Sequence, residues 1–164
     1  MLQPQRQLSG NVSRKEDVVG RTFQYLNRRW DVQLTGMSHG VGSGFLPNTS
    51  SWGVQFKPID DQSVEPFYGS ISSPDLTQLS DDDLRKSLES ALVLKALEDP
   101  NWDWRTAKGV ATDTGLPEER VRELLESSTP VMRSSVPDKE GRSLYTTRRH
   151  YKSRRSFLDS IRTT

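Results

Sequence analysis

The chain of 164 residues contains no cysteine, and this absence removes several kinds of chemistry. Disulfide bonds, thiolate catalysis and cysteine-based zinc sites are all excluded. A reducing compartment fits such a composition, so we expect a cytoplasmic protein.

Long apolar runs are also missing, which argues against a membrane protein. No stretch approaches the roughly 18 apolar residues that a membrane span needs. Residues 1–10 are polar and lack the apolar core of a secretory signal, so no secretion is expected. Hydrophobic residues make up only 32% and the mean hydropathy is −0.74. We therefore expect a core of limited size.

Histidine is scarce, occurring only as His39 and His150. Neither lies beside a nucleophile or an aspartate in a recognisable catalytic pattern. The acidic runs Asp60-Asp61 and Asp81-Asp82-Asp83 are better explained as a turn and as a helix start than as metal ligands. We therefore predict a protein that is not an enzyme, with no metal site, no cofactor and no small-molecule substrate.

The N-terminal part is predicted to form a small α/β region. A capping box at Ser13-Arg14-Lys15-Glu16, followed by apolar residues at helical spacing, indicates a helix over 14–29. Alternating apolar residues over 31–35 and 52–57 indicate two short strands that could pair. The turn-rich stretch 58–80 leaves room for one edge strand.

A glycine-rich stretch lies between the two predicted strands, over residues 36–44. Its glycines invite comparison with a phosphate-binding loop. That motif ends in Gly-Lys-Ser/Thr, and this stretch contains no lysine and leads into no helix. We interpret it as a mobile hairpin loop.

Three predicted helices follow. The first begins at Ser80, whose acidic successors suit a helix start, and ends near residue 98. Two shorter helices over 105–112 and 117–127 flank Gly115, which supplies the left-handed position of a tight turn. Trp102 and Trp104 in the first connection are expected to pack over the helices.

Two strands over 131–134 and 144–147 with an intervening turn complete this half. The order helix, helix, turn, helix, hairpin is that of a winged helix-turn-helix domain. The fold class is thus predicted to be α+β. Three parts are expected: a small N-terminal region over 1–74, the winged helix over 75–147, and a basic tail or helix over 148–164.

Several short motifs in the C-terminal half form a pattern. They are Trp102-Asp103-Trp104-Arg105-Thr106, Gly109-Val110-Ala111, Thr114-Gly115-Leu116, Val121-Arg122 with Leu124-Leu125, and Gly141-Arg142-Ser143-Leu144-Tyr145-Thr146-Thr147. The pattern resembles a family of bacterial winged-helix domains that are appended to peptidases, NTPases and other effectors of defence and signalling systems. The resemblance covers about residues 84–150 and implies an adaptor or nucleic-acid-binding role.

The third predicted helix carries the wrong charge for reading DNA. Residues 75–129 hold seven basic and thirteen acidic residues, a net charge of −6. Packing the apolar residues inward turns a largely acidic face outward, which phosphates would repel. That face is instead a candidate protein-interaction site, made of Glu118, Glu119, Arg122 and Glu123.

Residues 130–164 have the opposite character, with nine basic and three acidic residues and a net charge of +6. Basic residues interleaved with aromatic ones suit a phosphate backbone with some base stacking. The predicted nucleic-acid-binding residues are Arg133, Arg142, Tyr145, Arg148, Arg149, Lys152, Arg154 and Arg155. The alternatives are a solvated basic helix and a surface for an acidic protein.

These patterns predict a non-catalytic protein that binds DNA or RNA, mainly through backbone contacts of the wing and the arginine-rich tail. A bacterial defence or regulatory complex is the setting that the resemblance implies. The main alternative is an adaptor whose acidic third helix binds a basic partner, such as an effector enzyme. A dimeric transcriptional regulator is a third hypothesis, for which the sequence offers no clear dimer helix.

Overall fold

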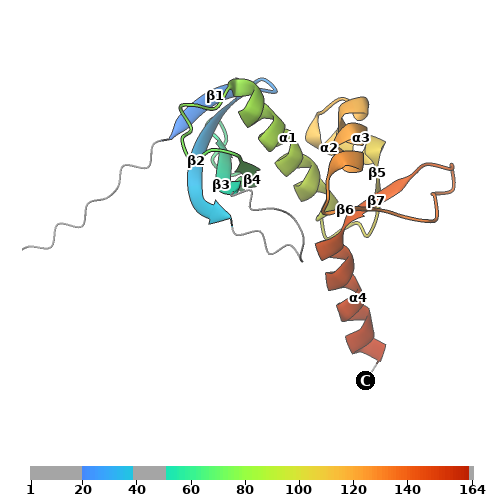
Figure 1. Cartoon of the computed structure of the whole chain (residues 1–164). Helices are drawn as coiled ribbons and strands as arrows, with labels where there is room; N and C mark the ends of the chain where they lie inside the picture. The colour runs from blue at the N-terminus through green and yellow to red at the C-terminus, as the bar shows by residue number, and fades with distance from the viewer. Residues whose placement is uncertain (1–19, 39–50, 163–164) are drawn as a thin grey trace, which may run out of the picture.

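The computed structural model describes residues 20–38 and 51–162, which form a mixed α+β fold with antiparallel sheets (Figure 1). Within these residues, the N-terminal part is a four-stranded sheet in the order β1-β2-β3-β4. Its strands are β1 (Arg21–Tyr25), β2 (Arg28–Ser38), β3 (Ser51–Pro58) and β4 (Phe67–Ile71).

The prediction of a helix over 14–29 is wrong for residues 21–29, which form the β1-β2 hairpin. Phe23 and Trp30 fit a helical spacing, yet they also face each other across this hairpin, and both are buried. The turn is made by Leu26 and Asn27, whose φ angles of 52° and 56° match the tight turns that join antiparallel strands. Residues 14–19 lie outside the described residues.

The predicted pairing of the next two strands is confirmed. Val32 lies opposite Phe56 and Leu34 opposite Val54 in the β2-β3 ladder. The predicted edge strand is also present, as β4. Of the glycine-rich stretch, residues 36–38 belong to β2, while 39–50 lie outside the described part of the chain.

Helix α1 (Asp81–Leu97) begins where the sequence predicted. The Ser80 hydroxyl accepts a hydrogen bond from the backbone N–H of Asp83 at 3.1 Å, and the Asp83 carboxylate accepts one from the backbone N–H of Ser80 at 3.1 Å. These reciprocal bonds satisfy two N–H groups at the helix start. They stabilise the first turn of α1.

Two apolar cores meet along α1. Leu84, Leu88 and Leu92 pack with the sheet, whose core includes Phe56. Leu97, together with Val93, packs with the helices that follow. In Figure 1, α1 therefore lies between the sheet and the C-terminal helices. A division between residues 74 and 75 remains a prediction, but the helix that follows it belongs to both cores.

The remaining elements follow the predicted order, with one addition. They are β5 (Arg105–Thr106), α2 (Ala107–Thr114), α3 (Glu118–Ser127), β6 (Val131–Arg133), β7 (Leu144–Thr147) and α4 (Arg148–Arg162). The short strand β5, which the sequence prediction placed inside a helix, joins the hairpin in a sheet of order β5-β7-β6. Gly115 has φ 73° at the end of α2, and Leu116 after it is buried.

Candidate nucleic-acid interface

Helix α4 follows β7 without a linker and extends away from the rest of the molecule (Figure 1). Its first turn is capped by Thr147, whose hydroxyl oxygen accepts a hydrogen bond from the backbone N–H of His150 at 3.0 Å. The same hydroxyl donates to the Glu98 carboxylate at the end of α1, at 3.1 Å. The buried Thr147 thus caps α4 and connects its first turn to Glu98 at the end of α1.

One side of α4 packs against the connection between α1 and β5. The rings of Tyr151 and Trp104 are 5.9 Å apart between centroids. Nε2 of His150 is hydrogen-bonded to the carbonyl oxygen of Trp102 at 2.9 Å. Arg154 pairs with Asp103 at 3.0 Å. These contacts place the helix at a defined position relative to the hairpin.

The other side of α4 carries exposed cations. Lys152 and Arg155 make no ion pair among residues 20–36 and 51–155, whose side chains are described. Arg149 is 87% exposed, with its guanidinium 3.8 Å from the Glu98 carboxylate. Arg148 is exposed and donates to the carbonyl oxygen of Thr129 at 3.3 Å. At 100° per residue, these four positions span about 120° of the helix surface, opposite His150 and Arg154, and Tyr151 lies at the border of this face.

Tyr145 does not fit the predicted interface, because its side chain is only 4% exposed. It belongs to the apolar core beside α2 and α3, so the prediction that it contacts nucleic acid is wrong. Every residue of β7 from Tyr145 to Thr147 is buried, which the interleaving of basic and aromatic residues in the sequence could not reveal. Trp102 departs from expectation in the opposite sense. It is 53% exposed rather than packed over the helices, with Arg105 against its ring.

The turn of the β6-β7 hairpin is organised by its own ion pairs. The Asp138 carboxylate accepts hydrogen bonds from the backbone N–H of Arg142 at 2.8 Å and from that of Glu140 at 2.9 Å. It also accepts one from the Arg142 guanidinium at 2.6 Å, and these bonds hold the pKa of Asp138 below its ordinary value. The Arg142 guanidinium is therefore paired within the turn, whereas Arg133 on β6 is exposed.

The outer face of α3 is acidic, as predicted. Glu118 pairs with Arg122 at 2.8 Å, and Glu123 pairs with Arg120 at 2.9 Å. Glu119 is exposed and has no ion-pair partner in the described part of the chain. Among the described side chains Glu119 and Glu126 have no ion-pair partner, so the outer face of α3 keeps a net negative charge.

A buried carboxylate on α1 was missed by the sequence analysis. Glu89 is only 3% exposed and accepts a hydrogen bond from the Tyr25 hydroxyl at 2.6 Å. Its other oxygen accepts one from the Arg120 guanidinium on α3 at 2.7 Å. Burial, and then the hydrogen bond to Glu89 and its charge, raise the pKa of Tyr25 to about 12. This cluster joins the β1-β2 hairpin, α1 and α3.

Within the described residues, no group of three or more histidine, aspartate or glutamate side chains is arranged to hold a metal ion. None of the helices described is long and apolar enough to cross a membrane. Comparisons with protein-family models, with curated proteins and with solved structures found no significant match. The resemblance stated above therefore rests on the quoted motifs alone.

Proposed function

We propose that α1 to β7 form a winged helix-turn-helix and that the protein binds nucleic acid without catalysing a reaction on it. The support for the fold is the order α1, α2, turn, α3, β6, β7, with Gly115 at the turn and Leu116 packed between the helices. In this proposal the phosphate backbone contacts α4 and the β6-β7 hairpin rather than α3.

The observation that carries the proposal is the exposed basic face of α4. The opposite side of this helix, at His150 and Arg154, contacts the connection after α1, and the side chains of Arg148, Arg149, Lys152 and Arg155 are exposed. A row of cations on a fixed helix matches a phosphate backbone, whose binding releases counterions. Such contacts hold nucleic acid with little sequence discrimination. The exposed Arg133 on β6 would extend the contact along the hairpin.

The predicted basic residues differ in whether a carboxylate of the chain already pairs with them. Arg154 and Arg142, which the sequence also suggested, are paired with carboxylates and are therefore weaker candidates. We narrow the proposed contact set to Arg133, Arg148, Arg149, Lys152 and Arg155. Arg142 instead stabilises the hairpin turn through Asp138, and Arg154 fixes the position of α4 through Asp103.

Fluorescence anisotropy with labelled single- and double-stranded oligonucleotides, at low and moderate salt, tests this function. The double variant Lys152→Gln/Arg155→Gln is compared with Arg28→Gln/Lys57→Gln, which removes the same charge from the N-terminal sheet. Losing two phosphate contacts should lower the salt dependence, the slope of log K against log salt, by about 2. Absence of binding, or equal losses in the two variants, would contradict the proposal.

The acidic face of α3 supports a second candidate function, as an adaptor for a basic protein surface. Glu119 and Glu123 are exposed, and Glu119 has no ionic partner among the side chains described. The test is a pull-down from the native host with wild type and with Glu119→Lys/Glu123→Lys. A stable partner lost in the variant supports the adaptor, and a partner retained at the same level counts against it.

A further inference from the structure

The two edge strands of the N-terminal sheet, β1 and β4, have different surroundings. At the β1 edge, Arg21 donates to the carbonyl oxygen of Leu76 at 2.8 Å and pairs with Asp81, so the chain before α1 crosses there. At the other edge, β4 has the sequence Phe-Tyr-Gly-Ser-Ile, with no charged residue and no proline. Natural edge strands usually carry such residues, which prevent pairing with another chain. Among the described residues, β4 pairs with β3 alone.

A groove follows this edge. It consists of two adjoining hollows, of about 540 and 800 Å³, that share Tyr68, Ala91 and Leu94. The first is lined by every residue from Tyr68 to Ser72. Because successive side chains of a strand point to opposite faces, an unbroken run of this kind lines a hollow along the strand's edge. The hollow thus gives access to backbone as well as to side chains.

Helix α1 forms the other wall of the groove. Its lining residues include Lys86, Ser90 and Leu94, which recur every four positions and share one helix face. The helix approaches the strand closely at one point, since a Cβ atom on Gly69 would lie 2.6 Å from the Ser87 hydroxyl oxygen. Ser87 also donates to the carbonyl oxygen of Ser70 at 2.9 Å, which fixes the spacing between helix and strand.

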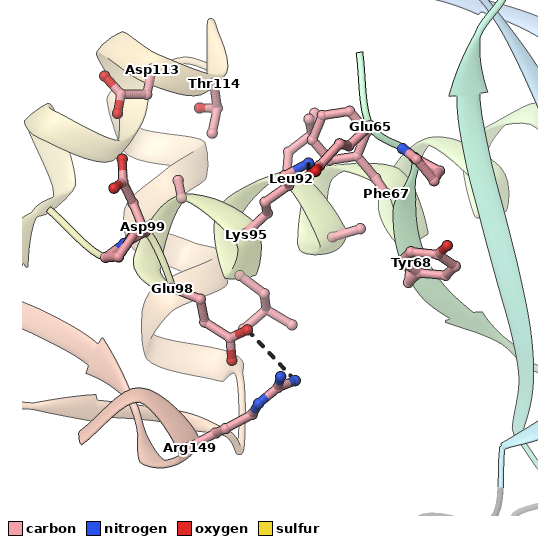
Figure 2. Close-up of a pocket in the computed structure, with 15 residues that line it drawn as sticks. Glu65, Phe67, Tyr68, Leu92, Lys95, Glu98, Asp99, Asp113, Thr114 and Arg149 are labelled. Carbon is pink, nitrogen blue, oxygen red and sulfur yellow. Dashed lines mark hydrogen bonds and ion pairs between the residues drawn. The ribbon is translucent and has the colours of Figure 1, made fainter. Parts of the chain in front are cut away.

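The second hollow has an acidic end. Figure 2 shows Tyr68 and Lys95 on one side, with Glu98, Asp99 and Asp113 toward the start of α4 and the end of α2. The lining of the two hollows together holds five carboxylates and three basic side chains. Asp99 makes no ion pair in the described part of the chain. The groove therefore changes from an apolar middle, at Tyr68 and Leu94, to an end where Asp99 is unpaired among the described side chains while Glu98 pairs with Arg149 and Asp113 with Arg105.

We propose that this groove binds an extended peptide segment of a partner protein, which adds to the sheet as a strand beside β4. Backbone groups of β4 other than the Ser70 carbonyl, which accepts from Ser87, supply the hydrogen bonds, and the groove supplies the side-chain preferences. An apolar side chain of the peptide packs on Tyr68 and Leu94, and a lysine or arginine further along meets Asp99 and its acidic neighbours. This surface adjoins the exposed basic face of α4 at Arg149, which lines the second hollow, so peptide and nucleic acid would meet at that residue.

The first experiment selects ligands from a displayed library of random linear peptides on the immobilised full chain. The enriched peptides should share apolar residues at alternating positions and a basic residue toward one end, without proline between them. A synthetic copy of the most enriched peptide is then added to the full chain, and amide hydrogen exchange is followed by NMR. The amides of β4 should exchange at least tenfold more slowly. Failure to enrich any peptide, or protection elsewhere in the chain, would overturn the proposal.

Variants assign the binding to the groove. Tyr68→Ala and Asp99→Asn should each weaken peptide binding about tenfold or more, and asparagine keeps an oxygen for the local turn bonds that Asp99 accepts from Asn101. Tyr68 is 64% exposed, so its removal should leave folding intact. The controls are Val136→Ala in the hairpin turn and Glu126→Gln on α3, both exposed and outside the groove, which should bind as wild type does. Equal effects in variants and controls would place the peptide outside the groove.

Two other occupants would be recognised in the same experiments. If a second copy of this chain takes the groove, sedimentation will show a dimer without peptide, and Tyr68→Ala will dissociate it. If the chain itself covers the edge, the β4 amides of the monomer will already exchange slowly before any peptide is added. Either result would overturn the assignment of the groove to a partner peptide.

Discussion

The sheet region (β1 to β4) and the helical region (α2, α3 and β5 to β7) have different cores but share one helix. The sheet region buries large aromatic rings, among them Trp30 and Phe56. The helical region buries mostly smaller aliphatic residues, such as Val110 and Val121. Neither core is complete without α1, because each takes part of that helix's apolar surface. Because α1 contributes to both cores, two regions with separate sequence signals can form one folding unit.

The contacts between the regions extend beyond α1. Tyr25 and Leu26, at the end of the β1-β2 hairpin, pack against both cores. The buried Glu89 connects Tyr25 to Arg120 through hydrogen bonds. Cooperative unfolding requires that loss of one region removes stabilising contacts from the other. We therefore expect the two regions to unfold in a single transition.

The largest effect is expected from truncating α1 in either core. Leu88→Ala acts on the sheet core and Leu97→Ala on the helical core, and both side chains are almost fully buried. Each should lower the free energy of unfolding by about 2–5 kcal/mol. Urea unfolding is followed by tryptophan fluorescence, in a background with Trp102→Phe and Trp104→Phe, for the sheet region, and by far-ultraviolet circular dichroism for the helices.

In each variant the two signals should change at the same urea concentration. Separate midpoints, with only the region that carries the substitution shifted, would show that α1 does not couple the cores. Val136→Ala is the control, because this exposed side chain in the hairpin turn contributes no core packing.

A smaller effect is expected at the polar link, which Glu89 forms between Tyr25 and Arg120. Glu89→Gln keeps the size of the side chain but removes the charge that faces Arg120, which leaves that guanidinium without its closest buried partner. Breaking a fully buried pair costs about 3–5 kcal/mol. Because Arg120 is partly exposed and also pairs with Glu123, we expect about 2 kcal/mol.

Glu123→Gln provides the matched control for this substitution. It removes the exposed partner of the same arginine and should cost about 0.5 kcal/mol or less. Equal unfolding free energies for the two variants would mean that the buried link contributes no more than a surface pair.

The two regions also differ in how far their sequence predicted them. The helical region has local signals that determine local structure: the reciprocal bonds of Ser80 and Asp83 start α1, and Gly115 ends α2. The β1-β2 hairpin turns at Leu26 and Asn27, a pair that gives no strong turn signal, while the spacing of its buried residues imitates a helix. Here contacts made by the whole sheet decided the conformation.

The candidate sites show the same limit. The basic run after β7 predicted a cationic surface, and the exposure of Lys152 and Arg155 agrees with it. The partners of Glu89 lie 64 and 31 residues away along the chain, so no local pattern could have identified them. The burial of Tyr145 likewise depends on its packing in a core to which α1, α2 and α3 all contribute. Composition predicts the charge of a surface, but tertiary packing decides which side chains reach it.

The smallest effect at neutral pH concerns Tyr25. Tyr25→Phe removes one hydrogen bond to Glu89 and should lower the free energy of unfolding by about 1 kcal/mol. Its effect depends on pH, because the folded protein raises the pKa of Tyr25 from 10.0 to about 12. The contribution of the raised pKa is fully present below pH 10. Above that value the unfolded chain releases the proton while the folded protein retains it, so this stability is lost as the pH rises toward 12.

Unfolding is therefore measured in urea at several pH values between 9 and 12, for wild type and Tyr25→Phe. The wild type should lose its advantage over the variant across this interval, while tyrosines elsewhere contribute equally to the two proteins and cancel in the difference. Glu89→Gln should move the loss to lower pH, because it removes the charge that opposes ionisation of Tyr25. If the difference between wild type and Tyr25→Phe is independent of pH, the hydroxyl is not held between the regions in solution, and the polar link between them is broken there.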